Sequence, residues 1–371
     1  MIAQPLTKLV VICSFWLIAF AQGESLYVAG KGGIYAFQLD DSDGTLSPAK
    51  LVAAVSAPSY LAFHPEQPFL YCTNNDGDKK TKSSSHLLSF LVTEEELIEL
   101  SSVETGGTTS AFVEVDKRGR FAFVANYRWG SIAGFQLEPD GRIGLPTVFV
   151  QHEGASTHPT RQTEPHPHAV RMSPDNRFAY VPDLGTDDVF IYQVNHFDGS
   201  LSSAIEPWSK AGQGSGPRHM DFHPRVDVAY VINELDSTVS VFTRNPDLGA
   251  LVASQTLSTL PQGYDGPNAC AHIQVHPNGK WVYGSNRGHN SIVVYETTSN
   301  GFLSWVDQHK TGSAPRHFAI SPSGNWLIAG NKGDSTLTVF RINPRTGQLV
   351  STEETPTPVP SPSCLAFSPS H

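Results

Sequence analysis

Four side chains of this chain combine the groups that acid–base chemistry on an anionic substrate requires. His168 supplies an imidazole and Glu234 a carboxylate, either of which can take a proton from water. Arg218 and Arg287 supply guanidinium groups, whose planar forks bind carboxylate or phosphate and stabilise a developing negative charge. The four residues are far apart in the sequence, so only the fold can bring them into one site.

Composition and motifs argue against several other classes of site. The 371 residues carry 25 basic and 35 acidic side chains, a net charge of −10, and no basic stretch that could neutralise nucleic-acid phosphates. No P-loop, GxSxG motif or glycine-rich nucleotide fingerprint occurs. The 15 histidines include His166 and His168, but no HExxH spacing. We therefore expect no metal, no cofactor and no nucleic-acid partner.

An internal repeat supplies the elements that would hold the four residues. Six copies of one pattern end at Asn or Asp, and each is followed by a third alternating run and a glycine turn. The aligned Pro or Lys positions recur about every 51 residues. Four short strands per unit of this length are the signature of a β-propeller blade, and no segment shows a sustained helical period. The copies are PSYLAFHPEQPFLYCTN (58–74), SAFVEVDKRGRFAFVAN (110–126), PHAVRMSPDNRFAYVPD (167–183), PRHMDFHPRVDVAYVIN (217–233), CAHIQVHPNGKWVYGSN (270–286) and PRHFAISPSGNWLIAGN (315–331).

The two ends of the chain each carry part of one more unit. LYVAG (26–30) starts at the second strand of a unit, whereas PSCLAFSP (362–369) is a first strand alone. Pairing these ends would complete a seventh blade and close the ring. A linear solenoid or two β-sandwiches would not explain the complementary halves. We therefore predict an all-β fold, a seven-bladed β-propeller closed by pairing of the N- and C-terminal strands.

Comparison of the repeats separates scaffold from candidate site. The Asn or Asp that ends each second strand is nearly invariant, which indicates turn chemistry with the side chain capping its own loop. The next position changes in every copy and holds Glu234 and Arg287 on adjacent blades. A second variable position, in the first strands that line the axis, holds His168, Arg218 and Arg316. We expect these side chains to face one axial pocket, with Arg316 as an additional member.

Simpler interpretations remain open for some of these residues. Glu234 and Arg287 could form only a pair of buried groups that satisfy each other. The histidines at 219, 272 and 317 fall one position away from the axial phase. We expect those three to form structural hydrogen bonds within blades.

Residues 1–23 have the features of a secretory signal peptide. Lys8 precedes the apolar run LVVICSFWLIAF (9–20), which is too short to span a bilayer comfortably, and the small residues that follow fit cleavage after Ala21 or Gly23. An uncleaved anchor or a buried first strand is the alternative. We expect a secreted monomer, outside the membrane after cleavage, with one propeller domain at residues 24–371.

Three cysteines, Cys72, Cys270 and Cys364, remain after such a cleavage. An odd number excludes a fully paired disulfide framework, and the spacings are unlike those of CxxC metal sites. One disulfide or three buried free thiols are both open.

Long runs in the chain resemble the lactonase family of seven-bladed propellers, which includes propeller-type 6-phosphogluconolactonase and the fungal carboxy-cis,cis-muconate cyclase. The resemblance covers residues 25–369 and implies lactone chemistry in the axial cleft. It also implies that the site residues are His168, Arg218, Glu234 and Arg287. His272 stands where the family usually has an acidic residue. The runs are QHEG (151–154), RQ (161–162), PHPHAVRM (165–172), GSGPRHMDFHP (214–224), AYVINELDSTVSVF (229–242), YGSNRGHNSIVVY (283–295) and APRHFAISPSG (314–324).

We therefore predict a hydrolase of the 6-phosphogluconolactonase type, whose partner is a small, anionic sugar lactone. Glu234 or His168 would activate water, while Arg218 and Arg287 would bind the carboxylate or phosphate of the substrate and stabilise the developing charge. Two guanidinium groups beside Glu234 would lower the pKa of that carboxyl, which favours His168 as the base. The alternatives are a cycloisomerase that opens or closes a muconolactone by proton transfer, and a secreted, non-catalytic propeller that binds a sugar or a protein.

Overall fold

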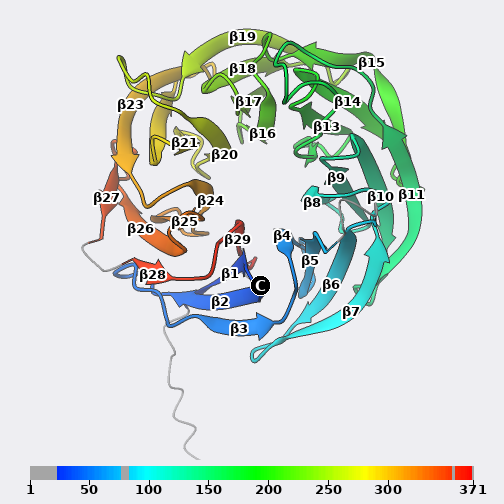
Figure 1. The fold of residues 1–371 in the computed structure, drawn as a ribbon, viewed down its shortest axis with the longest axis horizontal. Helices are drawn as coiled ribbons and strands as arrows, with labels where there is room; N and C mark the ends of the chain where they lie inside the picture. The colour runs from blue at the N-terminus through cyan, green and yellow to red at the C-terminus, as the bar shows by residue number, and fades with distance from the viewer. Residues whose placement is uncertain (1–22, 77–82, 353–355, 370–371) are drawn as a thin grey trace, which may run out of the picture.

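The chain forms a ring of seven β-sheets around a central axis (Figure 1). The structure, a computed structural model, describes residues 23–76, 83–352 and 356–369, and within these ranges 29 strands form the seven sheets and no residue is helical. The signal peptide predicted at residues 1–23 lies outside the described residues, apart from Gly23. No helix in the described part of the chain could span a lipid bilayer. The prediction of an all-β, seven-bladed propeller is confirmed.

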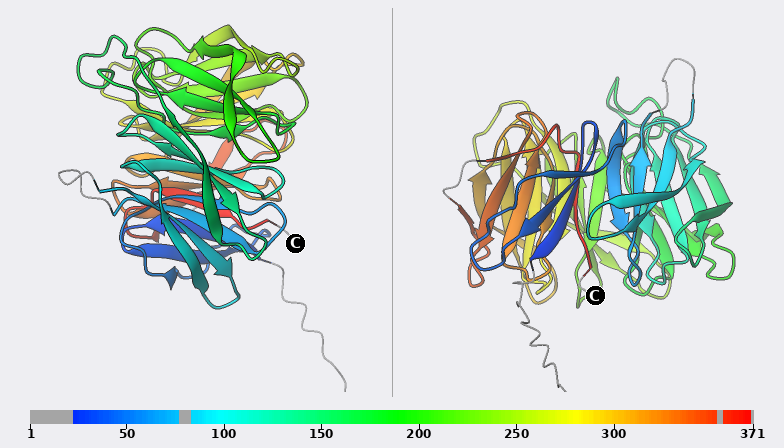
Figure 2. Two further views of the ribbon diagram at one scale, coloured as in Figure 1. Left: turned by 90° about the vertical axis from the view of Figure 1, so that its right-hand side faces the viewer. Right: turned by 90° about the horizontal axis from the view of Figure 1, so that it is seen from below.

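Each blade is an antiparallel sheet whose first strand lies nearest the axis and whose fourth lies at the rim, as Figure 1 shows. Seen from the side, the blades stand upright around the ring (Figure 2).

The closing blade contains β29 (Cys364–Phe367), β1 (Glu24–Gly30), β2 (Gly33–Leu39) and β3 (Lys50–Ala53). The next three contain β4 (Pro58–Phe63), β5 (Phe69–Asn74), β6 (His86–Val92) and β7 (Leu97–Glu104); β8 (Ser110–Val115), β9 (Phe121–Asn126), β10 (Ser131–Leu137) and β11 (Ile143–Gln151); and β12 (Arg171–Met172), β13 (Phe178–Asp183), β14 (Asp188–Val194) and β15 (Leu201–Lys210). The last three contain β16 (Pro217–Phe222), β17 (Val228–Asn233), β18 (Thr238–Arg244) and β19 (Leu251–Ser258); β20 (Ala269–Val275), β21 (Trp281–Arg287), β22 (Ser291–Thr297) and β23 (Leu303–Lys310); and β24 (Pro315–Ile320), β25 (Trp326–Asn331), β26 (Thr336–Ile342), β27 (Leu349–Ser351) and β28 (Thr357–Pro358).

The ring closes where the sequence predicts. Strand β29 pairs antiparallel with β1, so that Leu26 lies opposite Phe367 and Ala29 opposite Cys364. Backbone hydrogen bonds thereby join the two ends of the described chain within one sheet. The seventh blade cannot open without breaking this ladder.

A recurring contact between a tyrosine and a glycine turn joins neighbouring blades. The hydroxyl of Tyr180 donates to the carbonyl oxygen of Gly249 in the next blade at 2.7 Å, and that of Tyr230 donates to Gly301 at 2.7 Å. Gly249 has a φ of 74°, and a Cβ there would lie 2.5 Å from the ring of Phe178. Because only glycine fits so close to a ring in this conformation, the repeated glycine turn belongs to the scaffold.

The Asn or Asp at the end of each second strand does more than cap its own loop. Asn233 Nδ2 donates to Thr238 Oγ1 across that loop, as predicted. Asn126, however, donates to the carbonyl oxygen of Thr105 and accepts a hydrogen bond from Ser110 Oγ. These two partners belong to the segment that leads into the blade. The prediction of a local cap is therefore incomplete, since the side chain also anchors the preceding connection.

All three cysteines of the described residues are buried free thiols, so no disulfide joins them. Burial raises the pKa of Cys270 and of Cys364 to about 12, which leaves almost no thiolate near neutral pH. We expect iodoacetamide at pH 8 to leave the native chain that starts at Glu24 unmodified and to add three groups after unfolding in guanidinium, as read by intact mass. Rapid modification of the native protein would contradict this burial.

Candidate active site

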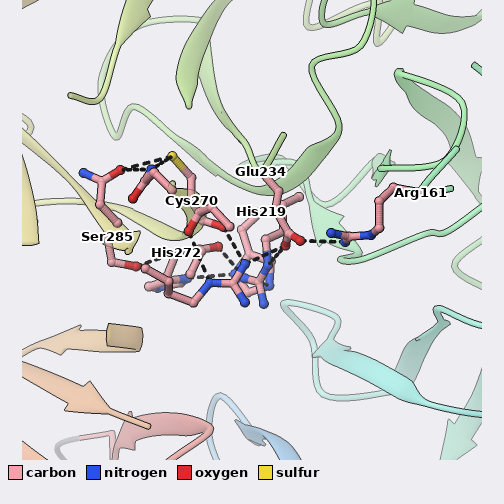
Figure 3. A network of polar contacts seen from close by, with 12 residues as sticks. Arg161, His219, Glu234, Cys270, His272 and Ser285 are labelled. Atoms are coloured by element: carbon pink, nitrogen blue, oxygen red, sulfur yellow. Dashed lines mark hydrogen bonds and ion pairs between the residues drawn. The ribbon is translucent and has the colours of Figure 1, made fainter. Parts of the chain in front are cut away.

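Glu234 lies at the centre of a cluster of guanidinium groups. Arg161 Nη2 donates to Oε1 at 2.6 Å, while Arg218 Nε and Arg287 Nη2 donate to Oε2 at 3.0 and 2.7 Å. Figure 3 shows Arg161 reaching Glu234 from the side opposite to His272. The structure thus joins three of the four predicted site residues by direct contacts. Glu234 and Arg287 form part of a larger network rather than an isolated pair.

The repeat explains how the strands bring these groups to one end of the axis. Glu234 directly follows β17 and Arg287 ends β21, in two neighbouring blades. Arg218 is the second residue of β16, at a register shift between Pro217 and His219 that leaves it without a partner in β17. Such a bulge changes where consecutive side chains point. It allows both Arg218 and His219 to contribute to the centre of the ring.

The three guanidinium groups determine the charge state of Glu234. Burial by itself would raise the pKa of this carboxyl, but the charges of Arg287 and then Arg218 hold it well below the ordinary value of 4.5. Both carboxylate oxygens already accept hydrogen bonds. Glu234 is therefore an ionised group that organises the arginines and is poorly suited to take a proton from water.

Arg218 is too deeply buried for the role expected from the sequence. It is 1% exposed, and besides Glu234 its guanidinium donates to the ring of His219 and to the carbonyl oxygen of Ala271. A side chain enclosed in this way fits a role in positioning Glu234 better than direct binding of a substrate anion. Arg287 and Arg161 have side chains that are 19% and 38% exposed, so these two guanidinium groups remain accessible.

His168 lies beside this cluster. Its ring centroid is 5.1 Å from that of Tyr127 and 5.4 Å from that of His219. The residue is 6% exposed, and its Nδ1 is buried without a hydrogen-bond partner among the described residues. Burial, followed by the charge of Arg218, holds the pKa of His168 well below 6.5. The imidazole is therefore neutral at pH 7 and can accept a proton.

The backbone around His168 departs from the regular repeat. The repeat predicts a first strand from residue 167, but β12 includes only Arg171 and Met172. An isolated bridge between Pro167 and Asp183 and a 2.9 Å hydrogen bond from His168 N to the carbonyl oxygen of Pro182 hold the preceding residues against β13. His168 consequently keeps its place near the axis although the strand is interrupted.

The histidines at 219, 272 and 317 connect different blades, so the prediction that their contacts stay within blades is wrong. His219 Nδ1 lies 2.9 Å from His272 Nδ1, and the rings of His272 and His317 stack with centroids 3.8 Å apart. Strict strand alternation would turn these residues away from the axis. Register shifts at the start of β16, β20 and β24 break that alternation. The three rings line a cavity of about 310 Å³.

Comparison of the repeats missed Arg161 because this residue has no counterpart in other blades. It lies between β11 and β12, in a connection held by Gln162, whose Nε2 donates to Leu184 O at 2.8 Å and Asp187 Oδ1 at 2.6 Å. Arg161 also donates to the Tyr127 hydroxyl at 3.3 Å. The sequence feature that could have indicated Arg161 is the pair RQ at 161–162, which belongs to the runs that carry the family resemblance.

Arg316 makes no hydrogen bond or ion pair with Glu234, so it does not extend the cluster by direct contact. Across residues 23–76, 83–352 and 356–369, no group of three or more His, Cys, Asp or Glu side chains is placed to hold a metal ion.

Comparison with known proteins assigns the family. The sequence model of a family described as lactonase, 7-bladed beta-propeller, matches residues 24–367. The chain belongs to this lactonase propeller family. It is 31% identical over 342 residues to a Bacillus subtilis protein named 6-phosphogluconolactonase, with 91% of this chain and 95% of that one covered. A Yersinia pestis protein of the same name is 28% identical over 336 residues, with 90% and 95% covered.

Members of the family with solved structures share the whole fold. The structure described as Pseudomonas aeruginosa periplasmic gluconolactonase superposes with a TM-score of 0.86 at 30% sequence identity. The superposition covers 93% of this chain and 98% of that one. The family resemblance predicted from the sequence runs is confirmed.

Proposed function

We propose that the protein is a lactone hydrolase that acts on a sugar lactone at the end of the axis where Glu234 lies. The observation that carries this proposal is the neutral His168 beside a carboxylate that holds three guanidinium groups. The names of the relatives support it, because two are 6-phosphogluconolactonases and one is a gluconolactonase.

His168 is the general base in this proposal. It takes a proton from a water molecule while the water oxygen attacks the carbonyl carbon of the lactone. When the ring C–O bond breaks, the imidazolium returns that proton to the leaving ring oxygen, so that one water is consumed and one hydroxy acid forms. Because its pKa is held low, the imidazolium gives the proton back readily.

Arg287 and Arg161 stabilise the negative charge that develops on the carbonyl oxygen. They are the accessible members of the cluster, and Glu234 fixes the direction of both guanidinium groups. Donors held in place before the reaction stabilise an oxyanion without reorganisation, which gives this kind of interaction its large effect. Arg218 acts through Glu234 as a positioning residue.

The proposal includes export of the protein, with residues 1–23 as the signal peptide. The apolar run at residues 9–20 and the small residue at Ala21 support it. The description of the Pseudomonas relative as periplasmic is consistent with a family member that acts outside the cytoplasm.

The function is tested with the purified chain that starts at Glu24. We expect it to open glucono-1,5-lactone or its 6-phosphate faster than the uncatalysed reaction, measured as proton release with a pH indicator. Conversion of a muconolactone alone would overturn the proposal in favour of a cycloisomerase. No turnover by a folded, monodisperse sample would overturn it in favour of a binding propeller.

A further inference from the structure

A second cavity opens beside the strands that close the ring. It has a volume of about 350 Å³ and lies where β24, β29 and β4 are neighbours around the axis (Figure 1). The residues that matter for its chemistry come from three blades and include Arg316 at the start of β24 and Lys332 after β25. Lys31, Ser59 and Asn75 also line it.

Residues that line the cavity stand at the two variable positions of the repeat. Arg316 and Ser59 stand in the first-strand position that holds Arg218 in another blade. Lys332, Asn75 and Lys31 each follow the end of a second strand, which is the position of Glu234 and Arg287. The cavity is therefore on the same face of the propeller as the Glu234 cluster.

Three cations line this cavity without a carboxylate to neutralise them. No Asp or Glu is among the residues that surround it in the described chain. The Arg316 guanidinium and the ammonium groups of Lys332 and Lys31 make no hydrogen bond or ion pair with the described residues. In a chain with a net charge of −10, this is a local concentration of positive charge.

The Glu234 cluster cannot supply the missing negative charge. Its single carboxylate already accepts hydrogen bonds from Arg161, Arg218 and Arg287. Three cations face one anion there, so that cluster is itself positive. The cations of the second cavity add to this excess.

The positive charges in and near the cavity also repel one another. Burial and then the charge of Arg287 lower the pKa of Arg316 to about 10. The Lys332 side chain remains accessible to solvent at the rim, but partial burial and then the charges of Arg316 and Arg287 lower its pKa to about 8. These effects place Arg316 within electrostatic reach of the Glu234 cluster. A bound anion would relieve the repulsion.

We propose that the cavity formed by Arg316, Lys332, Lys31, Ser59 and Asn75 binds the phosphoryl group of a phosphorylated sugar lactone. This inference rests on the proposed function and identifies the part of the site that recognises the end of the substrate remote from the ester. A phosphoryl group near neutral pH carries close to two negative charges and three acceptor oxygens. The cavity supplies one guanidinium and two ammonium groups, together with nearby hydroxyl and amide groups. These groups match the charge and the acceptor oxygens of a phosphoryl group better than those of a carboxylate.

Binding of the reaction products tests this subsite without depending on turnover. We compare 6-phosphogluconate, gluconate and glucarate by titration calorimetry at one ionic strength, since exposed charges are screened by salt. We expect 6-phosphogluconate to bind at least about ten-fold more tightly than the other two, as for a charge-assisted contact. In the double variant Arg316→Gln, Lys332→Gln, we expect that preference to fall to about two-fold.

The matched control is Lys280→Gln. Lys280 is exposed and directly precedes β21, at the end of that strand remote from Arg287, and we expect this variant to keep the wild-type preference. Equal binding of 6-phosphogluconate and gluconate by the wild type, or an unchanged preference in the double variant, would overturn the subsite. Equal binding of glucarate would overturn its assignment to a phosphoryl group. Absence of turnover on every lactone with the binding preference intact would overturn the proposed function alone.

Discussion

Replacement of His168 with alanine is expected to lower kcat for lactone opening by about 10²- to 10⁴-fold, the usual contribution of a general base. Glu234 is poorly suited to replace this base, because its carboxylate is held ionised and both of its oxygens accept hydrogen bonds from arginines. Steady-state proton release in the purified variant measures the effect. Full activity of this variant would remove His168 from the mechanism.

The pH profile of the wild type tests the low pKa of His168, and a control variant tests whether the loss of activity is specific to this histidine. The folded pKa of His168 lies well below 6.5, so the base stays deprotonated and kcat/KM should remain level as the pH falls past that value. Activity should decline only in more acidic solution. His223→Ala is the control, since His223 is also buried but its Nε2 donates to the carbonyl oxygen of Gly279 in the neighbouring blade. We expect that variant to lose stability and keep kcat.

The fold could be predicted almost completely because a propeller repeats its own sequence. Six copies of one pattern revealed the strand order, and the incomplete units at the two ends revealed the closure between β29 and β1. The repeats also distinguished scaffold from site, since the glycine turns and the terminal Asn recur, whereas the positions of Glu234 and Arg287 vary. Family resemblance then led to the same four residues.

The parts of the site that were missed depend on departures from the repeat. The bulge at Arg218 cannot be seen in an alternating pattern, so His219 was placed on the wrong side of its strand. Arg161 belongs to a connection without a counterpart in other blades. The depth of Arg218 depends on how β16 and β20 pack together, which the sequence of neither strand reveals.

Glu234→Gln is expected to destabilise the fold and also to abolish most of the lactone opening. The variant leaves Arg161, Arg218 and Arg287 beside a neutral amide, whose NH₂ group cannot accept from any of them. Removal of one partner from a buried ionic network costs about 3–5 kcal/mol of unfolding free energy. Urea denaturation at pH 7 measures this cost. Glu296→Gln, at an exposed site on β22, should have little effect.

The pH dependence of that cost distinguishes the loss of a charge from a simple packing defect. Because the pKa of Glu234 is depressed in the folded protein, the unfolded chain binds more protons below the ordinary value of 4.5. The stabilisation from this carboxylate is thus present above pH 4.5 and is lost progressively as the pH falls below it. The difference in stability between wild type and Glu234→Gln should shrink from pH 7 toward pH 3. A difference that is the same at both pH values would mean that the arginines do not depend on the charge of Glu234.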